Sequence, residues 1–149
     1  MPCNANTAYQ ETMSKLKTVL DAGGYLNVNT EWPNVRNEKP EERETESDRT
    51  DPWIRVVWQH IESQPRTVGS ANGLRRYENF GLLTVSMHTP SGHGLTEISN
   101  FATTILNGFR GKSTSSGVVY HAGVPKEVGR EGNYFRSEAL IDFQYDEIV

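Results

Sequence analysis

Apolar residues recur at intervals of three and four between Leu95 and Phe109, and this is the strongest periodic pattern in the sequence. The residues in the pattern are Leu95, Ile98, Ala102, Ile105 and Phe109, with Phe101 and Leu106 beside them. This spacing is typical of a helix that buries one stripe of its surface. Gly111 can end the helix. A chain with such a helix needs a second apolar layer to cover the stripe.

Three segments rich in β-branched and aromatic residues predict that layer as strands. They are "WIRVVWQHI" from Trp53 to Ile61, "RRYENFGLLTVSMH" from Arg75 to His88, and "YFRSEALIDFQYDEI" near the C-terminus. The last segment alternates apolar and polar residues, as a strand with one buried face does. "SGVVYHAG" predicts a further short strand, and "PKEVGREGN" predicts a turn.

An earlier helix is predicted from Thr7 to Ala22. Its apolar stripe is Tyr9, Met13, Leu16 and Leu20. Thr7 and Gln10 have the spacing of a capping box, and Gly23 can end the helix. The order of helices and strands predicts one α+β domain over residues 1–149. We expect an antiparallel or mixed sheet, two helices packed on one face, and long mobile loops.

The predicted strands carry apolar residues on both faces. In the first, Ile54, Val56 and Trp58 point one way, whereas Trp53, Val57 and Ile61 point the other way. In the second, Phe80 and Leu82 lie opposite the expected core face, so this face either meets a partner or is covered by the chain's own loops. Aromatic residues and arginine are enriched at protein interfaces. Contacts with other subunits are therefore expected from the following set: Trp53, Trp58, Phe80, Leu82, Arg75 and Arg76.

The segment from Arg36 to Asp51 contains no apolar residue except Pro40, and it carries 7 acidic and 4 basic residues. It cannot bury enough surface to order itself, so we expect a mobile loop. The alternative is that it becomes ordered on a partner, with Glu42 and Glu44 in contact there. The loop from Gln64 to Leu74 is a second candidate for such a contact.

The corner "MHTPSGHG" carries residue types that occur in catalytic and metal sites. His88 and His93 flank Ser91, but zinc needs about four ligands and the only cysteine, Cys3, is remote. The corner does not match G-x-S-x-G, and the glycine-rich loops do not match phosphate-binding patterns. We therefore expect no metal, no cofactor and no catalytic residue. A small hydrolase that uses His88, Ser91 and His93 remains the enzyme alternative.

The net charge is −4, and Arg75–Arg76 is the only adjacent basic pair. Proteins that bind nucleic acid usually show a basic surplus or a basic patch, so this class is disfavoured. The absence of a long apolar run and the polar N-terminal segment predict no membrane span and no secretory signal.

The order of these pieces resembles small phage proteins of the lambda-like tail terminator or tail-completion type. The pieces that carry the resemblance are "WPN", "WIRVVW", "GLLTVSMHTPSGHG" with its following helix, the helix end "FRG", "GVVYHAG", and the closing "FQYDE" from Phe143 to Glu147. The similar region runs from about Tyr9 to Glu147.

The resemblance implies a structural virion protein, made in the host cytoplasm, that forms a hexameric ring on the end of the tail tube. Such a ring ends tube polymerisation, contacts the tube protein and joins the tail to the head-tail connector. Genomic DNA passes through its lumen. A connector or neck protein of the same virion is the nearest alternative.

Overall fold

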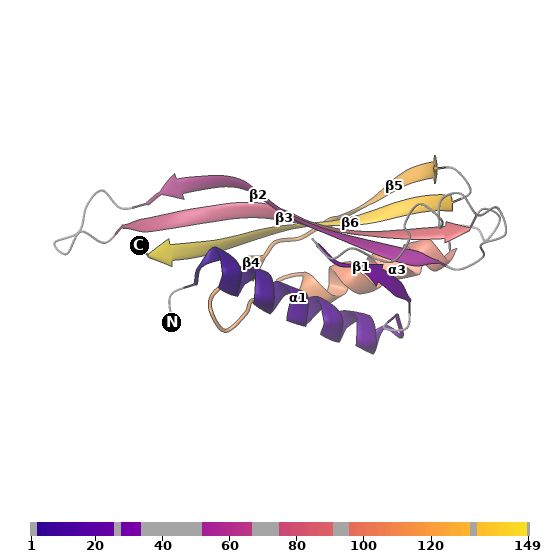
Figure 1. Ribbon diagram of the computed structural model, residues 1–149, viewed down its shortest axis with the longest axis horizontal. Coiled ribbons are helices and arrows are strands. Elements are labelled where there is room, and N and C mark those ends of the chain that lie inside the picture. Colours follow the sequence, from indigo (N-terminus) through magenta and orange to yellow (C-terminus); the bar gives the residue numbers. More distant parts are fainter. Residues whose placement is uncertain are drawn as a thin grey trace.

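The computed structural model describes residues 3–25, 28–33, 52–66, 75–90, 96–131 and 134–148, and these residues form an α+β fold. The elements are α1 (Ala5–Ala22), β1 (Asn29–Glu31), β2 (Trp53–Pro65), β3 (Arg76–Pro90), α3 (Thr96–Phe109), β4 (Val119–Tyr120), β5 (Val124–Glu131) and β6 (Tyr134–Ile148). Both helices lie on the same side of one long, twisted sheet (Figure 1). Neither helix combines the length and apolar character needed to cross a membrane.

The sheet is mixed, as expected for the predicted fold class. Its strand order is β1-β2-β3-β6-β4, and β5 also pairs with β6. Among the described strands, only the short β1–β2 pair is parallel; β2, β3 and β6 form a long antiparallel ladder. The chain reaches β6 only after α3, β4 and β5, so the central pair β3–β6 joins segments far apart in the sequence.

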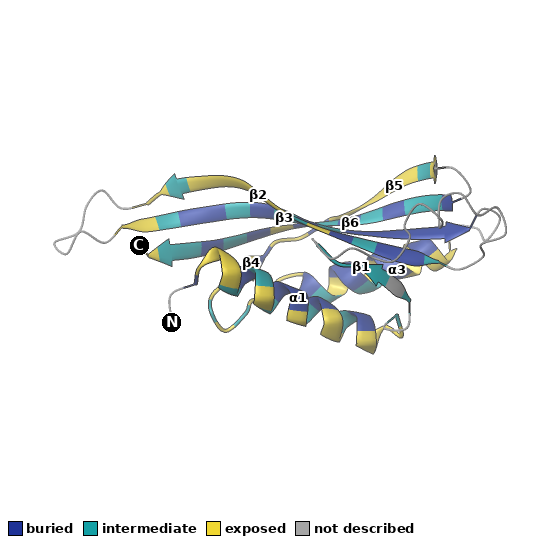
Figure 2. Ribbon diagram, viewed as in Figure 1, coloured by how far each residue is buried: buried dark blue, intermediate teal, exposed yellow. Residues whose placement is uncertain are grey.

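The core fills the space between the helices and one face of the sheet. The predicted stripe of α3 is buried from Ile98 to Phe109, with Ile105 and Phe109 fully covered, and Leu95 lies outside the described residues. From α1, Leu16 and Leu20 are buried against it. The sheet contributes alternate residues of its three long strands, among them Ile54, Val56, Leu83, Val85, Met87, Ala139, Ile141 and Phe143. Burial follows the helix-facing side over much of the sheet, but β3 is buried on both faces from Val85 to Pro90 (Figure 2).

The first helix begins two residues earlier than predicted. Its N-cap is Asn4, whose side-chain oxygen accepts a hydrogen bond of 2.8 Å from the backbone N–H of Thr7. The capping box predicted at Thr7 and Gln10 is therefore wrong. Asparagine is among the strongest N-cap residues because its short side chain reaches the free N–H groups of the first turn.

The register of β2 shifts between His60 and Glu62. Ile61 is the extra residue of this bulge and is 65% exposed. Simple alternation predicts Ile61 on one face with Trp53 and Val57. Ile61 has no partner across the ladder, because a bulge inserts one residue that the facing strand does not match.

The segment predicted as the turn "PKEVGREGN" is mostly strand. Residues Val124–Glu131 form β5, which pairs antiparallel with β6. Its register shifts between Glu127 and Gly129, and Gly129 has a φ of 97°. Glycine reaches this backbone conformation at little cost, which allows a bulge within the strand. The proline, the charged residues and this glycine all have low β propensity, so local propensity does not predict this strand.

Candidate interaction surface

The sheet face that points away from the helices carries a band of apolar side chains. The ladder places Val57, Thr84, Leu140 and Val124 side by side across four strands. Leu82 and Phe80 follow on the same face of β3, and Phe80 lies in register with Gln144 and Val119. The apolar members form what we call the apolar band: Val57, Phe80, Leu82, Val119, Val124 and Leu140.

Much of the apolar band is open to solvent. Val57 and Val119 are each 42% exposed and Val124 is 57% exposed, whereas Phe80, Leu82 and Leu140 are partly buried. No described helix lies over this face (Figure 1). A contiguous apolar area on an open sheet face is typical of a surface that binds another protein.

Charged residues flank the apolar band on one side. The next row of the ladder brings together Arg55, Ser86, Glu138 and Lys126. Arg136 lies 3.7 Å from Glu138, and Arg55 lies 3.5 Å from Glu31. This edge of the band is therefore crossed by paired charges.

A polar network lies on the other side of the apolar band. The nearly buried carboxylate of Glu78 accepts hydrogen bonds from Arg66 and from the side-chain amide of Gln144. Gln144 is also hydrogen-bonded to His121, with 3.1 Å between Oε1 and Nε2. An apolar centre with a polar rim is the usual anatomy of a protein–protein interface.

The predicted contact residues separate into two groups. Phe80 and Leu82 belong to the apolar band. Trp58 instead lies on the helix side, half-buried and stacked on Phe143 with ring centroids 3.8 Å apart. Trp53 is on the open face but only 3% exposed, so its side chain is packed within this chain.

Of the charged residues predicted for contacts, Arg75 and Arg76 are exposed at the start of β3. Arg76 forms an ion pair with Asp146. Glu42 and Glu44, with the whole segment 36–51, lie outside the described residues, as do residues 67–74 of the second predicted contact loop.

His88 is held in a packed environment. Its imidazole stacks on the indole of Trp53, and its Nε2 is 3.5 Å from Ser86 Oγ. Burial lowers the pKa of His88 to about 3, and the positive charges of Arg55 and Arg136 act in the same direction. His88 is therefore neutral near pH 7. Its proposed hydrolase partners, Ser91 and His93, lie outside the described residues.

The described residues contain no group of three or more histidine, cysteine, aspartate or glutamate side chains that could hold a metal ion. Tyr120 and Tyr145 are the other groups with strongly altered acidity. Burial raises the pKa of each to about 12, so both remain protonated at neutral pH.

Sequence reasoning missed half of the apolar band. Leu140 is an apolar residue among the polar, outward-facing residues of β6. This exception to the alternation could have indicated an apolar area on the open face. Val124 lies in β5, which was read as a turn, and Val119 belongs to a strand of only two residues.

Comparison with known proteins adds information about the fold. No protein-family model matches this chain, and no curated protein matches it either. Among solved structures 25 chains match. One of them superposes with a TM-score of 0.62 over 91% of this chain and 94% of its own, with 11% sequence identity. At that level of identity the similarity shows the fold alone.

Proposed function

We propose that this protein is the ring-forming tail terminator of a bacteriophage, which caps the tail tube and joins it to the head-neck connector. The observation that carries the proposal is the apolar band on a sheet face that has no described helix over it. Such a face gains free energy when copies of the chain or a neighbouring ring protein cover it. The sequence resemblance to tail terminators supplies the identity of the assembly.

The proposed role needs two different ends on one subunit. Subunits that contact each other through two different surfaces form a closed ring when the repeated rotation brings the last subunit back to the first. One side of the ring then repeats the contact that the tube protein makes with itself, and the opposite side does not. Tube growth ends because the next tube ring finds no matching surface.

The charge of the chain is compatible with a channel through which DNA passes. Strong DNA binding requires many lysine or arginine contacts to phosphate. With a net charge of −4, each subunit offers no basic surplus for such contacts. A lumen built from these subunits would allow DNA to pass without holding it.

The proposal is tested by the mass of the purified protein and by its place in the virion. Sedimentation velocity over a wide range of concentrations should show a species near six subunits. Imaging of the purified virion should place its density between tube and connector. A chain that is monomeric at every concentration, and absent from assembled particles, would contradict the proposal. Density one layer closer to the head would favour the neck-protein alternative.

A further inference from the structure

One edge of the sheet is formed by β4 and β5, which follow each other along the side of β6 that faces away from β3. We call residues 119–131 the β4–β5 edge. An edge strand presents backbone N–H and C=O groups that can pair with a strand of another molecule. Whether this edge accepts such a strand decides how copies of the chain can join.

The β4 part of the edge is occupied by the chain itself. Ser113 forms an antiparallel bridge with Val119, whose other partner is Gln144 of β6. Ser113 therefore lies on the outer side of β4. The backbone N–H of Tyr120 donates a hydrogen bond of 3.1 Å to the carbonyl oxygen of Lys112. A strand from another molecule cannot pair with β4 without displacing this segment.

The outer side of β5 lacks a donor at Pro125. The backbone carbonyl of Lys126 lies on the β6 side, where it accepts a hydrogen bond of 3.5 Å from the hydroxyl of Ser137. The backbone groups of successive strand residues point to alternate sides, so those of Pro125 and Glu127 point away from β6. Proline has no N–H, and within sheets it is confined to such outward positions. An added strand would find no donor there.

A bulge interrupts the same strand two residues later. The register of β5 against β6 shifts between Glu127 and Gly129. A bulge bends the strand and disturbs the spacing of its hydrogen-bonding groups. Only Lys126 and Glu127 lie between Pro125 and the bulge, and both side chains are exposed. Charged side chains, proline and bulges are the features by which natural edge strands avoid pairing.

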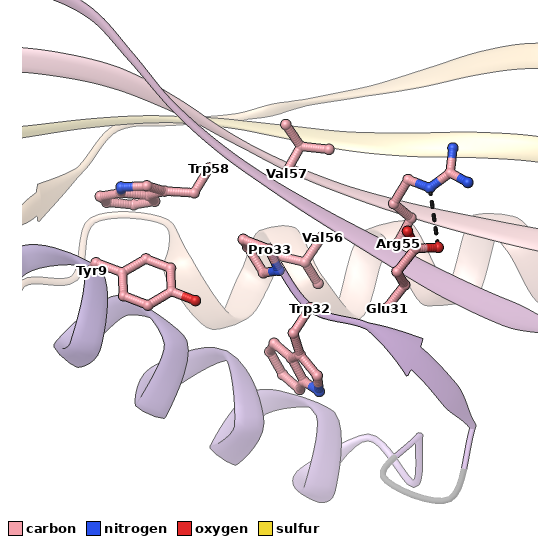
Figure 3. A pocket seen from close by; sticks show the side chains of 8 residues that line it. All are labelled: Tyr9, Glu31, Trp32, Pro33, Arg55, Val56, Val57 and Trp58. Atoms are coloured by element: carbon pink, nitrogen blue, oxygen red, sulfur yellow. Dashed lines mark ion pairs between the residues drawn. The ribbon is translucent and has the colours of Figure 1, made fainter. Parts of the chain in front are cut away.

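The opposite edge of the sheet is built from other strands. β1 runs parallel to β2 and pairs with it from Trp53 to Arg55. Figure 3 shows this pair, in which Glu31 of β1 lies 3.5 Å from Arg55 of β2. If a sheet continued head to tail through several copies, this edge of one copy would pair with the β4–β5 edge of the next. Closure of either edge is sufficient to prevent that arrangement.

We infer that the β4–β5 edge is closed to strand addition, and that no continuous sheet joins the subunits of the proposed ring. The second part rests on the proposed function. A ring uses two different surfaces of each subunit, whereas pairing of the β1–β2 edge with its own copy uses one surface twice and ends at a dimer. Ring neighbours are therefore joined by packed side chains, for which the apolar band provides the exposed apolar surface.

A variant with an opened edge tests the first part. Pro125→Thr restores a donor, Lys126→Thr removes a charge, and deletion of Val128 removes the bulge. Sedimentation velocity at increasing concentration should show association of this triple variant beyond that of the control, Lys126→Thr alone, which keeps the proline and the bulge. Equal association of the two at every concentration would overturn the inference.

Hydrogen exchange in the unchanged chain tests the second part. The amide of Glu127 points outward, whereas that of Lys126 points toward β6 and serves as the internal control. Between dilute and assembled protein, exchange at Glu127 should change less than about threefold, because no strand covers it. Slowing by more than about tenfold would show that a strand has added to this edge.

Failure of this inference can be distinguished from failure of the proposed function. A hexameric ring in which the Glu127 amide is protected would contradict the closed edge and leave the ring intact as a proposal. A chain that never assembles would contradict the ring, while the comparison of the triple variant with Lys126→Thr would still decide whether the edge is closed.

Discussion

The indole of Trp53 lies parallel to the imidazole of His88, with ring centroids 3.8 Å apart and planes 7° apart. The two residues are direct partners across β2 and β3. Tyr134 meets the indole edge to face, and the guanidinium of Arg55 lies 4.9 Å from its centroid. This packing explains why an aromatic residue on the open face of the sheet is nevertheless buried.

The first prediction concerns pH. In the folded chain His88 stays neutral down to about pH 3, whereas in the unfolded chain it binds a proton below its usual pKa of 6.5. The unfolded state therefore holds more protons between these values. The free energy of unfolding should rise with pH through this window, by up to roughly 1.4 kcal/mol per pH unit, and level off above it.

The measurement is urea unfolding at several pH values. His88→Phe keeps a ring beside Trp53 and removes the titrating nitrogen, so its stability should depend less on pH between 3 and 6.5. An NMR titration of His88 with a midpoint near 6.5 in the folded protein would contradict this prediction.

The second prediction concerns a buried hydrogen bond between α1 and β4. The hydroxyls of Thr12 and Tyr120 are 2.7 Å apart, and both residues are buried. Tyr120→Phe should lower the free energy of unfolding by about 1–2 kcal/mol, because it leaves the Thr12 hydroxyl without its partner. Adding Thr12→Val should recover part of this loss.

A matched control is Tyr145→Phe. Tyr145 is hydrogen-bonded to His60 at 2.8 Å, but His60 is exposed and can bond water instead. Its loss in urea unfolding should be smaller than that of Tyr120→Phe. Equal losses in the two variants would show that burial of the partner does not decide the cost.

The third prediction concerns Gly81 in β3. A methyl group at this position would lie 2.5 Å from the backbone oxygen of Gln59 and would overlap the ring of Phe143. Gly81→Ala should therefore destabilise the protein by more than about 2 kcal/mol, as overpacking of a core does. Thermal unfolding of a double variant tests the cause. Gly81→Ala should cost less stability when Phe143 is already replaced by leucine than in the unchanged protein, because leucine leaves room for the added methyl group.

The fourth prediction concerns the apolar band. Leu82→Lys places a charge in the middle of the band beside Asp142, its partner on β6, so the fold should persist. The proposed ring should dissociate, with at least a tenfold loss of association. Gln59→Lys introduces the same charge in the same row of the ladder, at the edge of the band, and should assemble normally. Sedimentation velocity distinguishes these outcomes, and similar association of both variants would exclude the band as a subunit contact.

Elements with a strong period of their own could be predicted from the sequence. The apolar stripe of α3 and the alternation of β6 repeat often enough to reveal both structure and burial. β1 and β5 could not be predicted in this way. β1 has only three residues, and β5 exists because it pairs with β6 despite Pro125 and the bulge at Gly129.

The candidate surface was harder to predict than the fold. Alternation placed Phe80 and Leu82 on the open face of the sheet, which the structure confirms. Whether a residue on that face is exposed depends on contacts between distant segments. Trp53 is covered by His88 and Tyr134, whereas Val124 is left open. No local pattern distinguishes these two cases.

The bulge at Ile61 also affects how β2 can tolerate changes in length. Glu62 pairs with Phe80 directly after His60 pairs with Gly81, so the ladder skips Ile61. Deleting Ile61 would leave every later pair in register and every side chain on its present face. A deletion between Ile54 and Gln59 would instead exchange inside and outside for part of the strand. Ile61 therefore marks the position in β2 at which natural variants of this chain could gain or lose a residue and still fold alike.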